Sequence, residues 1–93
     1  MADDFRDNEA ESRFELDVGG SIAFVAYRKS PGTITLVHTE VPAELGGKGI
    51  GSKLARATLD AVRAQGRKLT VKCEFIQGFM GKHPEYNDLL AAS

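Results

Sequence analysis

The sequence predicts an α/β fold in which a mixed sheet is combined with helices, in the order strand, strand, strand, helix, strand, helix. Three observations indicate this class. The first half of the chain alternates apolar and polar residues with a period of two, as half-buried strands do. The segment 50–65 repeats its apolar residues at helical spacing. A short apolar run follows it, which is typical of a parallel strand reached through a right-handed crossover helix.

The composition limits the chain to one domain and a small set of partners. With 93 residues, 42% of them hydrophobic, it has the size and the apolar content of one domain with a modest core. Its formal net charge of −1 gives no general attraction to nucleic acid or to an anionic membrane. One cysteine allows no internal disulfide, so a reducing cytoplasm is expected. No apolar run approaches the roughly 20 residues that span a bilayer. The oligomeric expectation is a monomer or a weak homodimer.

Residues 1–12 differ in composition from the rest. They are polar and mostly acidic, with Phe5 as their only aromatic side chain. Such a segment cannot bury enough apolar surface to order itself. We therefore expect a disordered acidic tail over residues 1–12 and a single folded domain over residues 13–93.

The first two strands form a predicted hairpin. Residues 13–18 alternate charged side chains with the apolar residues Phe14, Leu16 and Val18. Gly19-Gly20 supplies a two-residue turn that accepts positive φ. Residues 21–29 are apolar on both faces over part of their length, so this second strand is expected to be covered on both sides.

The third strand and the elements after it lead to the candidate site. After the turn Ser30-Pro31-Gly32, residues 33–41 are rich in β-branched side chains, with Ile34, Leu36 and His38 expected on one face. Pro42 ends this strand because it cannot donate to a ladder. The remaining expected elements are a helix over 50–65 that stops at Gly66, a strand over 69–73, and one or two short helices over 75–90 that break at Pro84.

The most informative stretch is the glycine-rich turn that opens the long helix. It runs Gly46, Gly47, Lys48, Gly49, Ile50, Gly51 and Ser52. Glycines let the backbone approach a ligand closely, and the first amides of a helix have no internal partner. With the helix dipole, these groups favour a phosphate or diphosphate. The alternative is that the glycines only make a tight turn between a strand and a helix.

Two other phosphate motifs can be tested on the same residues, and both fail. A P-loop needs Gly-Lys followed directly by Ser or Thr, whereas the order here is Gly51-Ser52-Lys53. A dinucleotide fingerprint that starts at Gly47 or Gly49 lacks its third glycine, because Ser52 and Leu54 occupy those places.

The stretch resembles the pyrophosphate loop of the GNAT superfamily of N-acetyltransferases. Gly49 and Gly51 match the loop, while Gly46 stands where the family usually has Gln or Arg. The chain as a whole is similar to the short single-domain N-acetyltransferase-like group. The likeness covers residues 14–90 through the following motifs in one order: His38-Thr39-Glu40-Val41-Pro42, the glycine loop, Cys73, and His83-Pro84-Glu85-Tyr86. Two residues depart from the group: Glu74, where proline often follows the cysteine, and Phe79, where tyrosine is common.

This resemblance implies a minimal GNAT-like fold whose sheet splays where the third and fourth expected strands part. It implies acetyl-coenzyme A as cosubstrate, with the pantetheine arm in the splay bonded to the backbone of Thr39, Glu40 and Val41. The diphosphate would lie on the loop, and the adenosine end near Lys48 and Lys53 at the surface. Phe79 has no hydroxyl, so it cannot protonate a departing thiolate.

Two residues are candidates for the chemistry of acetyl transfer. Cys73 and His38 end neighbouring parallel strands on this fold, so they are expected to face each other across the thioester. They could form an acetyl-cysteine intermediate, or His38 could act alone as the base for direct transfer. The alternatives are a small buried apolar residue for Cys73 and a core histidine for His38. No metal site is expected, because two histidines and one cysteine at unrelated spacings form no ligand set.

The leading hypothesis is an acetyl-coenzyme A-dependent N-acetyltransferase that acts on an exposed amine, such as one on a protein or peptide. The alternatives are a noncatalytic module that binds acyl-coenzyme A and an interaction domain that keeps only the fold.

Overall fold

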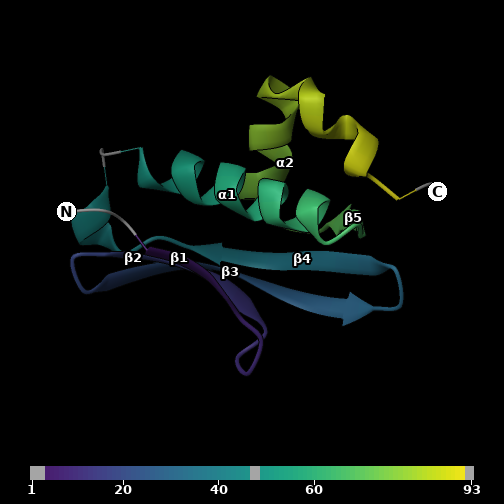
Figure 1. The fold of residues 1–93 in the computed structure, drawn as a ribbon. Helices are drawn as coiled ribbons and strands as arrows, with labels where there is room; N and C mark the ends of the chain where they lie inside the picture. Colours follow the sequence, from purple (N-terminus) through teal and green to yellow (C-terminus); the bar gives the residue numbers. More distant parts are fainter. Residues whose placement is uncertain (1–3, 47–48, 92–93) are drawn as a thin grey trace.

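The computed structural model describes residues 4–46 and 49–91, and it contains one sheet with both helices on one of its faces (Figure 1). The elements, in which η marks a 3-10 helix, are β1 Asp4–Asn8, β2 Arg13–Val18, β3 Ser21–Ser30, β4 Thr33–Glu40, η1 Ala43–Leu45, α1 Ile50–Ala64, β5 Lys68–Val71, α2 Glu74–Lys82 and η2 Pro84–Leu89.

The sheet has the mixed topology that the sequence predicts. Its strand order is β1-β2-β3-β4-β5. The first four strands pair antiparallel, and β5 joins β4 in parallel after the crossover through α1. The α/β class is therefore confirmed, but the sheet has five strands where four were expected.

The additional strand is β1, so the expectation of a disordered tail over residues 1–12 is wrong for residues 4–12, while residues 1–3 lie outside the described residues. Phe5 stacks on the buried ring of Phe14, with ring centroids 5.8 Å apart. The carboxylate of Asp7 accepts a hydrogen bond of 2.5 Å from the hydroxyl of Tyr27. Contacts with partners far along the chain order this polar segment.

A buried carboxylate fixes β1 against β2 on the face of the sheet away from the helices. Glu15 is 1% exposed, and its two oxygens accept hydrogen bonds from Arg6 at 2.7 Å, Arg13 at 2.5 Å and Asn8 at 3.1 Å. Burial alone raises the pKa of Glu15, but these hydrogen bonds outweigh it and lower the pKa below its ordinary value. Three charged or polar side chains therefore cover this part of the sheet instead of a helix.

The opposite face of the sheet carries the core. The helix α1 begins and ends close to the predicted bounds, and Gly66 follows it with a φ of 69°. Its buried residues lie along one side of the helix and pack onto the sheet: Ile50, Leu54, Ala55, Thr58, Leu59 and Val62. From the sheet, Phe14, Leu16, Val25, Ile34 and Leu36 complete this core.

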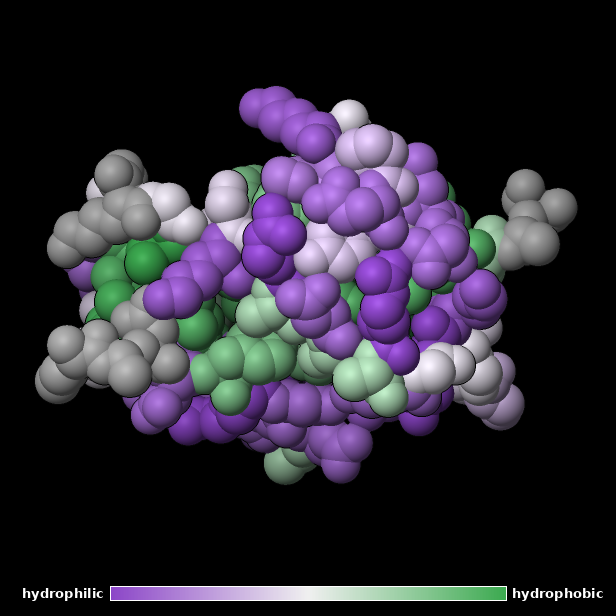
Figure 2. Space-filling view, turned by 45° about the horizontal axis from the view of Figure 1, so that its top comes forward, coloured by the Kyte–Doolittle hydropathy of each residue, from purple (hydrophilic) through white to green (hydrophobic). Residues whose placement is uncertain are grey.

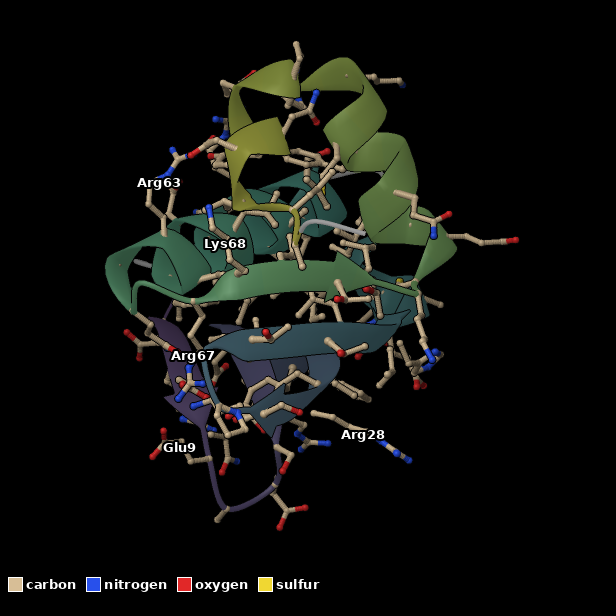
Figure 3. All side chains as sticks on the ribbon, turned by 90° about the vertical axis from the view of Figure 1, so that its right-hand side faces the viewer. Glu9, Arg28, Arg63, Arg67 and Lys68 are labelled. Carbon is tan, nitrogen blue, oxygen red and sulfur yellow. The ribbon has the colours of Figure 1, made fainter. Side chains whose placement is uncertain are left out.

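The C-terminal segment packs over α1 through charged side chains. Arg63 Nη2 lies 2.6 Å from the carboxylate of Asp88, and Lys68 Nζ donates to the Asp88 carbonyl at 2.9 Å. Figure 3 shows Arg63 and Lys68 on the side of the sheet where η2 lies, whereas Arg28 projects on the opposite side. The expected break at Pro84 is confirmed, since α2 ends at Lys82 and η2 begins at Pro84.

Candidate functional site

The strands β4 and β5 part at the end of the sheet where the candidate residues lie. Their pairing ends with Leu36 opposite Val71, and the Lys72 amide donates a last bond of 2.9 Å to the Leu36 carbonyl. β4 continues to Glu40, while the other chain turns away into α2. Among the described residues, no strand pairs with Val37–Glu40 on the side of β5. The predicted splay is therefore open along this edge of β4.

A β-bulge decides which way the side chains of β4 point. Leu36 pairs with Tyr27 and His38 pairs with Ala26, so Val37 is an extra residue in the ladder. The bulge interrupts the alternation, so the expectation that His38 shares a face with Ile34 and Leu36 is wrong.

After the bulge, His38 lies on the face of the sheet away from the helices. Its side chain is 60% exposed, its Nε2 lies 3.2 Å from a carboxylate oxygen of Glu40, and its ring is in edge contact with Phe24. Glu40 pairs with Phe24 and is 63% exposed on the same face. These two residues form an exposed histidine–carboxylate pair at the mouth of the splay.

Cys73 lies on the helix side of the splay. The predicted strand over 69–73 ends at Val71, and Cys73 is the residue before the first turn of α2. Its side chain is 7% exposed, and its Sγ lies 3.0 Å from the hydroxyl oxygen of Thr39. Thr39 points to this side because the bulge reverses the alternation of β4. The structure therefore brings Cys73 to Thr39 and not to His38, which points to the opposite face.

The N-terminus of α1 carries the amides of the glycine-rich turn. Gly49, at a φ of 70°, precedes the helix, and no side chain caps it. The amides of Ile50, Gly51 and Ser52 have no intrahelical acceptor, because the first bond of the ladder runs from the Lys53 amide to the Gly49 carbonyl at 3.1 Å.

Among the other described residues of the glycine turn, Gly46 does not add to this set of amides. The Gly46 amide donates a hydrogen bond of 3.0 Å to the Ala43 carbonyl, so the expectation of an unpaired amide is wrong at this position. Gly47 and Lys48 lie outside the described residues. Among the described residues, the amides of the first helical turn are therefore the part of the glycine turn that has no intrahelical acceptor.

Phe75 joins the glycine turn to α2, although no pattern in the sequence selects it as a site residue. A Cβ on Gly51 would lie 2.6 Å from the Cζ atom of the Phe75 ring. Gly51 therefore lets the aromatic ring settle against the first turn of α1. In the sequence, Phe75 is visible only as an aromatic residue two positions after Cys73. Periodicity alone assigns this residue to a helix face and does not indicate its contact with Gly51.

Tyr86 and His83 connect η2 to the helices. The Tyr86 hydroxyl donates to Asp60 at 2.8 Å, and the side chain is 3% exposed. Burial and the neighbouring Asp60 carboxylate raise the pKa of Tyr86. The His83 ring stacks on Phe79, with centroids 4.2 Å apart. These residues hold η2 against α1 and α2.

No described helix has the length and apolar character needed to cross a membrane. Within residues 4–46 and 49–91, no group of three or more acidic, histidine or cysteine side chains is arranged to hold a metal ion.

The sequence matches one protein family and several known proteins. A family model described as GCN5-related N-acetyl-transferase matches residues 13–89. Protein NATD1 of Xenopus tropicalis is 38% identical over 52 residues, which are 56% of this chain and 48% of that protein. Protein NATD1 of Bos taurus is 41% identical over 51 residues, 55% of this chain and 45% of that protein. The aligned part of the chain spans about half the length of these relatives.

The fold also resembles a solved structure. An NMR solution structure of a GCN5-like protein from Staphylococcus aureus superposes with a TM-score of 0.71 at 28% sequence identity. The match covers 97% of this chain and 89% of the other.

Proposed function

Because the chain belongs to the GCN5-related N-acetyltransferase family, we propose that it transfers the acetyl group of acetyl-coenzyme A to an amine. The observation that carries this proposal is the uncapped first turn of α1, with the amides of Ile50, Gly51 and Ser52, which follows the open edge of β4 in the chain. A diphosphate satisfies these amides and matches the positive end of the helix dipole. The pantetheine arm would then bond to the free β4 edge at Thr39, Glu40 and Val41, as an added strand does.

The thioester of the bound coenzyme would lie in the splay, between the two faces of the sheet. Cys73 and Thr39 border it on the helix side, and His38 with Glu40 borders it on the open side. An acceptor amine would reach the open side without displacing a helix, because no helix of residues 4–46 and 49–91 covers that face. In this arrangement we assign His38 as the base and Cys73 as part of the wall around the thioester sulfur.

In this direct route the acceptor nitrogen attacks the thioester carbonyl carbon and loses its proton to His38. The tetrahedral intermediate collapses and the carbon–sulfur bond breaks. Coenzyme A leaves as a thiolate, which takes a proton from solvent water. Phe79 has no proton to give. Cys73 offers a second route, in which its sulfur takes the acetyl group from coenzyme A and then passes it to the amine.

The acceptor we propose is an exposed amine on a protein or peptide. The side chains of His38 and Glu40 are more than half exposed, so the open side has no enclosed pocket that would require a small acceptor. The Glu40 carboxylate also favours the approach of a cationic amine. We place the reaction in the cytoplasm, where a thiol such as Cys73 stays reduced.

Binding is tested by titrating coenzyme A into the ¹⁵N-labelled chain. We expect the amide signals of Ile50, Gly51 and Ser52 to shift, while those of the distant hairpin glycines Gly19 and Gly20 stay in place. Unchanged signals at the first turn of α1 under saturating coenzyme A would refute the proposal.

A second function is favoured by two observations. His38 and Cys73 lie on opposite faces, and Phe79 lacks the hydroxyl of the common tyrosine, so a module that binds acyl-coenzyme A without turnover fits the same geometry. Acetyl-coenzyme A consumption with a panel of peptide amines separates the two functions. Binding without consumption supports the module.

A further inference from the structure

Lys72 lies at the point where β4 and β5 part. Its amide donates the last bond between them, 2.9 Å to the Leu36 carbonyl, and the chain then runs through Cys73 into α2. The residue is exposed, although it stands directly before the buried Cys73. The fold therefore keeps a primary amine at the splay, where the proposed function places the thioester.

The side chain of Lys72 is on the open face of the sheet. Leu69 is 1% exposed, Val71 packs against the core, and Cys73 is 7% exposed on the helix side. The chain remains extended through Cys73, whose φ is −89° and ψ is 121°, so alternation directs Lys72 to the other side. That side is the face on which His38 lies.

The amine of Lys72 is within reach of His38. From Leu36, which accepts the bond from the Lys72 amide, His38 is two residues away, or about 7 Å along β4. Paired strands lie about 4.8 Å apart, and the flexible four-carbon stem of a lysine spans a step of this size. The amine and the proposed base therefore border the splay from its two sides, on one face.

The ammonium group of Lys72 has no hydrogen-bond or ion-pair partner among residues 4–46 and 49–91. β5 runs toward the end of the molecule where α1 begins, and hydrophobic residues gather at the surface there, which offer no counter-ion (Figure 2). By contrast, Lys29 is paired with two carboxylates and Lys68 donates to a backbone carbonyl. Lys82 is also exposed, but it ends α2, about 12 Å along the helix from its first residue.

We propose that the chain acetylates itself at Lys72, with acetyl-coenzyme A as the donor. This inference rests on the proposed function, because it takes the thioester to lie in the splay. The Lys72 ammonium group loses a proton to His38, and its nitrogen attacks the thioester carbonyl carbon to form an amide. The carbon–sulfur bond breaks, and the coenzyme A thiolate takes a proton from water. An amine held in the same chain has a high effective concentration, which favours it over a peptide from solution.

The test is mass spectrometry of the digested full chain after incubation with saturating acetyl-coenzyme A. We expect acetyl groups to accumulate on Lys72 faster than on Lys82 by about tenfold or more, because an oriented amine gains at least this much over random collision. The fraction of Lys72 modified in a given time should not change when the chain is diluted, because the transfer is intramolecular. Desulfo-coenzyme A, which has no thiol to carry an acetyl group, should protect Lys72 and leave Lys82 as it was.

Two variants and a second donor are the controls. Lys72→Arg keeps the positive charge, but its guanidinium group cannot lose the proton, so the preferential modification should disappear. Lys82→Arg removes an equally exposed amine and should leave the modification of Lys72 unchanged. S-acetyl-N-acetylcysteamine, a thioester without the nucleotide, should acetylate Lys72 and Lys82 at similar rates.

The outcomes separate self-acetylation from the proposed function. If coenzyme A shifts the amides of residues 50–52 and peptide amines are acetylated, while Lys72 is modified no faster than Lys82, self-acetylation is refuted and the proposed function stands. A preference for Lys72 that also appears with S-acetyl-N-acetylcysteamine, or that survives desulfo-coenzyme A, refutes self-acetylation too, because the bound coenzyme is then not its source. If coenzyme A does not bind at all, both proposals fall.

Discussion

The ring of Phe75 occupies the space that a side chain at position 51 would need: a Cβ built on Gly51 lies 2.6 Å from its Cζ atom. This contact links the two halves of the candidate site. Gly51 belongs to the first turn of α1, whose amides have no intrahelical acceptor, and Phe75 stands two residues after Cys73 on α2. The position of the proposed coenzyme loop relative to the thiol therefore depends on the absence of one methyl group.

The first prediction concerns this contact. Gly51→Ala should lower the free energy of unfolding by about 1–3 kcal/mol, because the added methyl group overlaps the Phe75 ring and one of them has to move. It should also weaken coenzyme A binding, since the displaced turn carries the three amides. Urea unfolding followed by circular dichroism measures the first effect, and calorimetry measures the second.

A matched control uses another glycine. Gly81 lies in the last turn of α2 with nothing within 4 Å of its missing Cβ, so Gly81→Ala should be neutral or stabilising by up to about 1 kcal/mol. Phe75→Ala should relieve most of the cost of Gly51→Ala in the double variant. An equal cost of Gly51→Ala with and without the ring would show that this overlap is not its cause.

The second prediction concerns β1. Phe5→Ala should lower the free energy of unfolding by about 1–3 kcal/mol, because Phe5 is partly buried and stacks on Phe14 in the core. Glu11→Ala, in the exposed turn that follows, should change stability by less than about 0.5 kcal/mol. Chemical denaturation of both variants compares them directly. If Phe5→Ala and Glu11→Ala were equally stable, the packing of β1 through Phe5 would contribute nothing to the stability of the fold.

Local patterns predicted most of the fold. The positive φ values of Gly19 and Gly20 agree with the expected hairpin turn, and the apolar face of α1 was visible in the sequence because helical spacing repeats over four turns. β1 could not be read in this way. Asp7 looks like an unpaired acid in a tail, but its partners Tyr27, Lys29 and Gln65 are 20 to 58 residues away.

The candidate site was predicted in part. The wrong or missing predictions concern features that no local sequence pattern specifies. The splay was implied by the resemblance to the N-acetyltransferases, and the helix terminus followed from the glycines. The bulge at Val37 leaves no mark in the sequence, because a run of β-branched residues fits a regular strand equally well. That single extra residue turns His38 away from Cys73. The contact of Phe75 with Gly51 likewise joins two elements whose packing no local pattern specifies.

The third prediction is a pH dependence that comes from Glu15. Its pKa is below the ordinary value of 4.5, so the unfolded chain takes up a proton first as the pH falls. The stabilisation is complete above that ordinary value and is lost as the pH falls through the lowered pKa. Glu15→Gln should cost about 1–3 kcal/mol near pH 7, because Arg6 and Arg13 lose a charged acceptor.

The difference between wild type and Glu15→Gln should therefore shrink when urea midpoints are measured at about pH 7 and again at about pH 3. Glu11→Gln, at an exposed turn, serves as the control and should follow the wild type at both values. A difference that stays constant across this range would show that the Glu15 charge is not what stabilises the folded chain.

The last prediction separates the two chemical routes by the face on which each residue lies. His38 is on the open side, where an amine arrives, so His38→Ala should lower kcat by about 10²- to 10⁴-fold, the usual loss for a general base. Added imidazole should restore part of the rate, because it can occupy the vacated space and accept the proton. Cys73→Ala should retain kcat within about tenfold, since a buried wall residue contributes packing but no bond to the acetyl group.

Arg28→Gln, on the same face as His38 but outside the site, is the control and should behave as the wild type. Mass spectrometry after incubation with acetyl-coenzyme A alone should find Cys73 unmodified; an acetylated Cys73 that disappears when the amine is added would overturn the direct route and assign the transfer to the thiol.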